Sequence, residues 1–156
     1  MIDEIVIQPA SGSENLDLVH AMRYEVLRKP HGLSPVSATF EGDRLDSTMH
    51  FLAVHKNQMV GCVSILFDPS KTEAQLRGMA VQAELQGFGI GKRILEAAHS
   101  AALHANKSLW CNARCSAVGF YERYGWKKEG DLFEIPRIGP HWVMRWQISL
   151  KKTEQS

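Results

Sequence analysis

The segment from Leu76 to Gly91 constrains the fold of this chain more than any other. It begins as an apolar strand, passes through the glycine-rich run Gln86-Gly87-Phe88-Gly89-Ile90-Gly91, and then takes the spacing of an amphipathic helix. A helix that starts after such a turn presents free backbone N–H groups, which form an anion site. Two common phosphate loops are excluded. Arg93 stands where a Walker loop needs Ser or Thr, and Lys92 stands where a dinucleotide fingerprint needs its third glycine.

The composition is that of a globular chain without a strong charge. The 156 residues are 44% apolar and 22% charged, with a formal net charge of +1. This balance, with no basic stripe, argues against nucleic acid and anionic membranes as partners. No apolar run approaches the roughly 20 residues of a membrane helix. The acidic start Met1-Ile2-Asp3-Glu4 lacks a signal-peptide pattern and the three cysteines form no CxxC pair, so we expect a cytoplasmic protein with reduced thiols.

Hydrophobic periodicity predicts one mixed α/β domain over residues 1–150 and a polar tail at 151–156. Residues 30–48 contain three further proline and glycine breaks after Pro30 and few apolar side chains, which indicates a long irregular segment of the kind that often carries function. The expected helices are residues 16–27, 90–104 and 116–124. The expected strands are residues 2–8, 50–55, 59–67, 73–81, 109–112, 126–134 and 141–150.

A second motif follows the glycine-rich run and reads Ala117-Val118-Gly119-Phe120-Tyr121-Glu122-Arg123-Tyr124-Gly125-Trp126. In this order, the two motifs resemble the pyrophosphate loop and the A-x-x-F/L-Y-x-x-x-G-F/W signature of the GCN5-related N-acetyltransferases (GNAT). The resemblance runs from about Arg23 to Arg145. The run from Phe133 to Met144, with its Gly-Pro-His before the last strand, is similar to the ElaA-like branch of this family. Asp46 and His50 match the early D-x-x-x-H pattern of that branch.

The resemblance implies the GNAT acyl-CoA N-acyltransferase fold, an α/β fold with a mixed central β-sheet flanked by helices. It also implies an enzyme that moves an acetyl group from acetyl-CoA to a primary amine, on a small molecule or a protein, by direct attack on the thioester and without a metal. A backbone N–H of the strand at Met79 to Val81 would polarise the thioester carbonyl. The resemblance assigns these residues to the coenzyme: Met79, Ala80, Val81, Gln86, Gly87, Phe88, Gly89, Ile90, Gly91 and Lys92.

Tyr121 matches the tyrosine that, in many family members, protonates the departing CoA thiolate. A phenol with a pKa of ~10 serves a thiol with a pKa of ~8.5 only when the two are closely positioned. Tyr121 also lies on the apolar stripe of its own predicted helix. A core aromatic residue with one satisfied hydroxyl is therefore the second interpretation.

The chain differs from the family pattern at two places. Arg114 stands where many relatives have an asparagine that helps to hold CoA, and we expect it either to pair with a phosphate or to lie exposed. The strand at residues 109–112 lacks the glutamate that serves some relatives as a base. Because the amine must lose a proton before it attacks, a base or a water chain is needed elsewhere, and the candidate residues are His141, His50 and Glu134. Histidine suits this role at neutral pH, although each candidate also fits a structural role.

These differences leave a second class open, a non-catalytic CoA-binding sensor or interaction domain with the same fold. The acceptor side is less defined by the sequence. The resemblance places the acceptor pocket at the segment from Pro30 to Asp46, where Asp43 and Asp46 would either attract an amine or simply be solvated. Members of this family form dimers, so a homodimer is a further expectation, although no interface stands out in the sequence.

Overall fold

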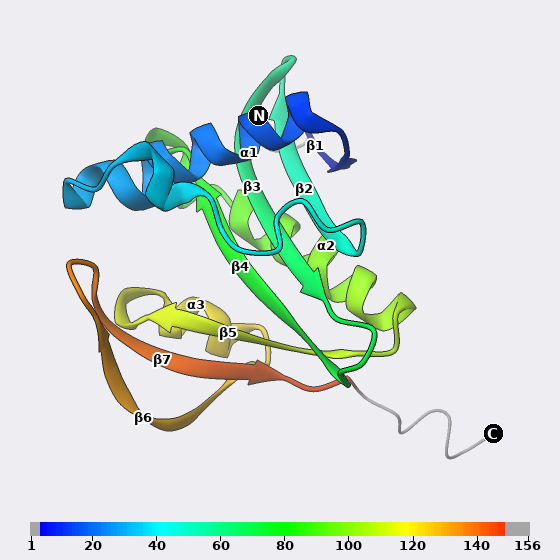
Figure 1. Cartoon of the computed structure of the whole chain (residues 1–156), viewed down its shortest axis with the longest axis vertical. Helices are drawn as coiled ribbons and strands as arrows, with labels where there is room; N and C mark the ends of the chain where they lie inside the picture. Colours follow the sequence, from blue (N-terminus) through cyan, green and yellow to red (C-terminus); the bar gives the residue numbers. More distant parts are fainter. Residues whose placement is uncertain (1–3, 149–156) are drawn as a thin grey trace.

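The computed structural model describes residues 4–148, which form a seven-stranded sheet in the order β1-β2-β3-β4-β5-β7-β6 (Figure 1). Neighbouring strands are antiparallel except for β4 and β5, which are parallel. The strands are β1 (Ile5–Ala10), β2 (Thr48–His55), β3 (Gln58–Phe67), β4 (Glu73–Val81), β5 (Ser108–Arg114), β6 (Lys127–Ile135) and β7 (Gly139–Trp146).

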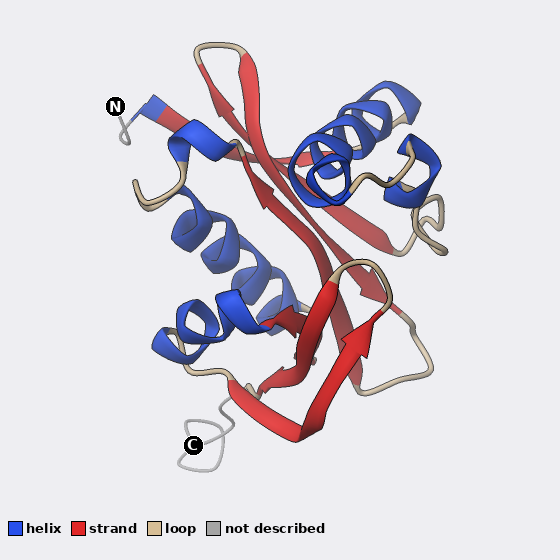
Figure 2. Cartoon of the chain, turned by 90° about the vertical axis from the view of Figure 1, so that its left-hand side faces the viewer, coloured by secondary structure: helices blue, strands red, loops and turns tan. Residues whose placement is uncertain are grey.

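Helices cover both faces of the sheet (Figure 2). Helix α1 (Ser13–Arg23) packs on one face, and α2 (Ile90–His104) and α3 (Val118–Arg123) lie on the other. Strand side chains alternate between the two layers, as the period of two requires. On β2, for example, Phe51 belongs to the core cluster under α2, whereas Leu52 belongs to the cluster under α1.

A β-bulge in β4 interrupts this alternation. Cys62 pairs with Ala80 and Ser64 pairs with Arg77, so one residue of β3 faces two residues of β4. The extra residue is Gly78, whose φ of +65° suits glycine, and a Cβ there would lie 2.6 Å from Nε of Arg23. Strands β4 and β5 diverge just before this bulge, since they pair only over residues 73–75 and 108–110. The divergence leaves facing backbone edges of β4 and β5 unpaired in the sheet.

A buried ion pair fixes the segment between α1 and β2. The Arg23 side chain is 0% exposed and donates hydrogen bonds to both carboxylate oxygens of Asp43, at 2.7 and 3.0 Å. It also donates to the Ala38 carbonyl and to Oγ of Ser64 on β3. Burial alone would raise the pKa of Asp43. The bonds from Arg23, the Phe40 N–H and His20 instead lower that pKa to about 2. Asp43 is therefore a structural carboxylate, and neither expectation for it, amine attraction or solvation, fits this position.

The structure confirms the predicted order of elements with modest shifts at their ends. The first helix continues beyond Arg23 as a π-helical turn, η2 (Tyr24–Arg28), followed by the 3-10 turn η3 (Lys29–His31). The irregular segment after it contains one further 3-10 turn, η4 (Pro35–Ala38). Two more short turns, η5 (Ala83–Leu85) and η6 (Cys115–Ala117), precede α2 and α3. The expected strand start at residues 2–3, the strand end at 149–150 and the tail at 151–156 lie outside the described residues.

Candidate active site

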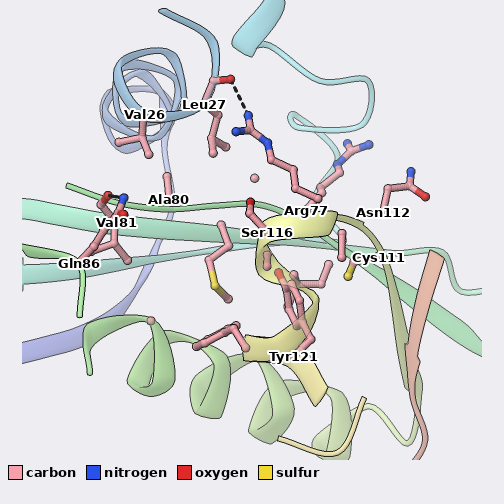
Figure 3. A pocket seen from close by; sticks show the side chains of 18 of the residues that line it. Val26, Leu27, Arg77, Ala80, Val81, Gln86, Cys111, Asn112, Ser116 and Tyr121 are labelled. Carbon is pink, nitrogen blue, oxygen red and sulfur yellow. Dashed lines mark hydrogen bonds between the residues drawn. The ribbon is translucent and has the colours of Figure 1, made fainter. Parts of the chain in front are cut away.

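A cavity of about 860 Å³ occupies the space between the diverging halves of β4 and β5 (Figure 3). Strand β4 contributes residues 75–81 to its wall, and β5 contributes residues 111–114. The π-helical turn η2 closes the cavity on the α1 side through Val26 and Leu27, and α3 closes it on the other side through Tyr121 (Figure 3). The unpaired backbone edges of both strands therefore face a space large enough for an extended ligand, which can add its own hydrogen bonds to such an edge.

The glycine-rich run forms one end of the cavity and has the geometry of an anion site. Gly87 and Gly89 have φ angles of +89° and +86°, and Gly89 is the N-cap of α2. No side chain caps this helix, so its first N–H groups are available to a ligand. Gln86 holds the run in place, since its Nε2 donates to the Val81 carbonyl at 2.9 Å (Figure 3). Lys92 lines the cavity from the first turn of α2 and adds a positive charge.

The structure brings most of the sequence-predicted site residues to this one cavity. Phe88 is not part of its lining and its side chain is 56% exposed, whereas Ile90 is 2% exposed and packs in the core. For these two residues only the backbone is available to a ligand. The predicted residues that line the cavity are Met79, Ala80, Val81, Gln86, Gly87, Gly89, Gly91, Lys92, Arg114, Tyr121 and His141.

The Tyr121 side chain lies both in the hydrophobic core and on the wall of the cavity. Its side chain is 6% exposed and belongs to the core cluster, with its ring 5.0 Å from that of Trp126, yet it also lines the cavity. Burial raises the pKa of Tyr121 well above its usual value of 10, and the neighbouring Cys111 raises it further. Burial also raises the pKa of the Cys111 thiol to about 12, although its hydrogen bond with Tyr121 lowers that pKa. Both groups are therefore protonated at neutral pH, and the Tyr121 side chain lies on the cavity wall (Figure 3).

His141 enters the cavity from β7 and has one defined hydrogen bond. His141 is 4% exposed, and its Nδ1 atom lies 2.7 Å from the Gly139 carbonyl oxygen. Because a carbonyl only accepts, Nδ1 carries the proton, and in the neutral ring Nε2 holds a lone pair. Within residues 4–148 no hydrogen-bond partner of Nε2 is found. His141 can therefore accept a proton from a group in the cavity.

His50 lies in the buried polar network rather than at the cavity. Its Nε2 donates to the Asp43 carbonyl at 2.9 Å, and its Nδ1 accepts from Oγ of Ser64 at 2.6 Å. Burial lowers the pKa of His50, so the ring is neutral and both nitrogens are already in use. His50 was a candidate base in the sequence. In the structure its ring instead joins β2 to β3 and to the segment at residues 39–47. Glu134 is exposed on β6 and is not in the cavity lining either.

Sequence reasoning missed several polar residues of the cavity wall. Arg28 lines it from η2. Arg77 on β4, Asn112 on β5 and Ser116 on η6 also line it (Figure 3). Arg77 carried a signal, since a charged residue in the middle of an otherwise apolar central strand needs a special environment. Arg28 carried none, because its place depends on the packing of η2 against the segment that follows it.

Neither a metal-ligand cluster nor a membrane-spanning helix is found in the part of the chain that the structure describes. No group of three or more His, Cys, Asp or Glu side chains could hold a metal ion there. None of its helices is both long and apolar enough to cross a membrane.

Comparison with known proteins identifies the family that the two sequence motifs resemble. The profile of the acetyltransferase (GNAT) domain matches residues 27–146. The N-acetyltransferase YitI of Bacillus subtilis (strain 168), itself described as uncharacterized, is 31% identical over 131 residues, which cover 80% of this chain and 87% of YitI. The crystal structure of Escherichia coli ElaA matches with a TM-score of 0.78 at 19% identity, over 90% of this chain and 98% of ElaA.

A GNAT acetyltransferase from Elizabethkingia anophelis, solved with acetyl-CoA bound, matches with a TM-score of 0.67 at 18% identity, over 94% of this chain and 99% of that one. The family profile and YitI together establish the assignment, and the two solved structures share the fold. The chain belongs to the GNAT family of N-acetyltransferases. It is an enzyme that uses acetyl-CoA as co-substrate and an amine as acceptor, and the alternative of a non-catalytic sensor is not favoured.

Proposed function

We propose that acetyl transfer takes place in the cavity between β4 and β5, with Tyr121 as the proton donor and His141 as the proton acceptor. The observation that carries this proposal is the convergence of three features on one cavity: the glycine-rich anion site, the neutral phenol of Tyr121 and the free Nε2 of His141. The N–H groups at the start of α2 and the charge of Lys92 would hold the pyrophosphate of the coenzyme. The open edge of β4 beyond Gly78 would hold its pantetheine arm.

Each step of the reaction can then be assigned to a group of this chain. His141 takes a proton from the acceptor amine through Nε2, and the amine nitrogen forms a bond to the thioester carbon. A backbone N–H near the β4 bulge stabilises the negative charge on the carbonyl oxygen. The C–S bond breaks, and the CoA sulfur takes the proton of the Tyr121 hydroxyl. Bulk water later returns the proton to Tyr121 and removes the one on His141, so the net products are the acetylated amine and CoA.

The raised pKa of Tyr121 does not prevent this donation. Burial raises the pKa of the neighbouring Cys111 thiol to about 12, and a CoA thiolate that departs beside it meets the same poorly solvated surroundings. Such a thiolate is a stronger base than in water, which narrows the gap to the phenol. Cys111 itself stays protonated and buried, which supports direct transfer rather than a covalent acyl-cysteine.

We also propose that the enzyme works in the cytoplasm. Supporting this, all three cysteines are free, and Cys62 and Cys111 are buried thiols. Such thiols persist in a reducing compartment. A homodimer stays a prediction, as does the absence of nucleic acid among its partners.

The test is CoA thiol release with an amine panel, measured for wild type and for four variants. For Tyr121→Phe and His141→Gln we expect kcat to fall by about 10²-fold or more, with acetyl-CoA affinity kept within twofold. Tyr24→Phe is the matched control for a lost hydroxyl, because Tyr24 lies on η2 and is not in the cavity lining. The assignment of the base is wrong if His141→Gln retains full turnover while His50→Gln loses it.

A further inference from the structure

The charge on the cavity wall is one-sided. Five arginine and lysine side chains line the cavity, and no aspartate or glutamate among residues 4–148 does so. Lys92 and Arg123 come from α2 and α3, the two helices nearest the glycine-rich run, where they face the expected phosphates of the coenzyme. Arg28, Arg77 and Arg114 come from η2, β4 and β5 instead. The part of the wall away from the glycine-rich run therefore has a positive charge of its own.

Arg28 and Arg114 converge on one point without a counter-charge. Nη1 of Arg28 and Nη2 of Arg114 both donate to the Leu27 carbonyl, at 3.2 and 3.0 Å, so these nitrogens lie at most about 6 Å apart. Neither arginine forms an ion pair with any carboxylate of the described residues. Burial lowers the pKa of Arg28, and nearby Arg114 and Arg23 lower it further. A carbonyl dipole does not neutralise two guanidinium groups, so an anion is the complementary ligand.

The aromatic residue Phe40 extends this basic region. The guanidinium carbons of Arg28 and Arg77 lie 5.3 and 5.4 Å from the centre of its ring, which also lines the cavity. Arg77 approaches Asp43 at 3.8 Å, but that carboxylate already receives two hydrogen bonds from Arg23. Asp43 is thus shared between Arg23 and Arg77, with Glu41 also acting on Arg77. No carboxylate of the described residues forms an ion pair with Arg28 or Arg114, so the region keeps a net positive charge.

The basic region lies beside the proposed proton acceptor. Arg114 on β5 and His141 on β7 are directly opposite each other in the antiparallel ladder, and both line the cavity. Side chains at such paired positions point to the same face, with Cβ atoms about 5 Å apart. An amine that meets Nε2 of His141 would therefore hold a nearby part of the same molecule against Arg114.

We propose that the acceptor is an amine that also carries an anionic group, a carboxylate or a phosphate, close to the nitrogen that is acetylated. The anionic group binds the guanidinium groups of Arg28 and Arg114, which offer paired N–H donors to such groups. The same arginines repel a polycationic amine, since no carboxylate in the cavity lining receives its additional charges. This inference rests on the proposed function of the cavity.

The test compares acceptors that differ in the anionic group. Wild-type protein with acetyl-CoA is assayed for thiol release with phenylalanine against phenethylamine, β-alanine against ethylamine, and O-phosphoethanolamine against ethanolamine, with spermidine as the polycation. We expect kcat/KM to be at least tenfold higher for the anionic member of a pair than for its neutral counterpart. Whether the carboxylate pairs or the phosphate pair shows this difference identifies the anionic group that is bound. Equal values throughout, or a preference for spermidine, would overturn the proposal.

Variants of the basic residues test which of them cause the preference for anionic acceptors. Arg28→Gln and Arg114→Gln should each reduce it by about tenfold while acetyl-CoA affinity stays within twofold, and Arg28→Lys should retain part of it. Arg44→Gln is the matched control, because Arg44 is exposed and is not in the cavity lining. An equal loss of affinity for acetyl-CoA in the Gln variants would assign these arginines to the coenzyme and overturn the proposal.

A binding measurement separates the two claims. The CoA-saturated wild-type protein is titrated calorimetrically with the same acceptor pairs. Absence of thiol release with every amine would contradict the proposed function. Tighter binding of the anionic members would still support the acceptor class in that case, and equal or absent binding would refute it.

Discussion

Replacing Asp43 with asparagine tests the buried ion pair that shapes the acceptor side of the site. Asparagine has nearly the same volume but leaves the Arg23 guanidinium, which is 0% exposed, without its charged partner. Removing one member of a buried pair costs about 3–5 kcal/mol, because the remaining charge stays desolvated. We therefore expect Asp43→Asn to lower the free energy of unfolding by that amount at pH 7.

The pH dependence of this loss follows from the pKa of Asp43. Its value of about 2 lies below the usual 3.8, so ionisation of Asp43 stabilises the folded state by about 2.4 kcal/mol at neutral pH. This stability is present above about pH 4 and is lost as the pH falls toward 2. The difference in free energy of unfolding between wild type and Asp43→Asn should accordingly narrow by about 2 kcal/mol between pH 7 and pH 2, with roughly half of that narrowing reached by pH 3.

Urea unfolding at several pH values, followed by circular dichroism, measures both quantities. Glu25→Gln is the matched control, because its ion pair with Lys29 is 3.5 Å long and both side chains are 60% exposed. Such a surface pair contributes at most about 0.5 kcal/mol. A loss below about 1 kcal/mol in Asp43→Asn at pH 7, or a difference that does not change with pH, would refute the reasoning.

Three further predictions concern single residues. Gly89→Val should raise the Kd for acetyl-CoA at least tenfold in a calorimetric titration, since valine disfavours the φ of +86° and blocks the approach of a phosphate. Gly130→Val, with a φ of +75° on β6, strains the backbone similarly and should leave that Kd unchanged; equal Kd increases would show that strain alone is responsible. Burial lowers the pKa of His99 to about 4, so wild-type stability should fall between pH 6.5 and 4, and His99→Gln should show a smaller fall in urea unfolding. Gly78→Ala should destabilise the protein by about 1–3 kcal/mol through its positive φ and the 2.6 Å approach to Arg23, whereas Gly119→Ala, in open space on α3, should be neutral or stabilising in the same assay.

The proposed coenzyme end of the site was predictable from the sequence because it depends on short-range patterns. A strand, a glycine-rich turn and a helix start follow each other within residues 76–91, and the free N–H groups come directly from that order. The helix that carries Tyr121 was readable for the same reason. The pattern also indicated that Tyr121 lies on an apolar stripe, and the structure places it in both the core and the cavity lining.

The proposed acceptor end was less predictable from the sequence because it depends on contacts between distant segments. Arg114 reaches the Leu27 carbonyl across 87 positions of sequence, and no local pattern records such a contact. His50 matched a family pattern, but its role is set by Ser64 and Asp43, which come from β3 and from the segment before β2. The bulge at Gly78 also depends on the neighbouring strand, although a glycine within an apolar strand is a signal for it.

The most direct test of the account is a calorimetric titration of the wild-type protein with acetyl-CoA, with CoA and ATP as comparison ligands. We expect micromolar binding of both CoA forms and no binding of ATP, because the proposed site between β4 and β5 would hold the pantetheine arm as well as the pyrophosphate. If the folded protein bound neither CoA form, the cavity would not be the coenzyme site, and the roles proposed for Tyr121 and His141 would be contradicted with it.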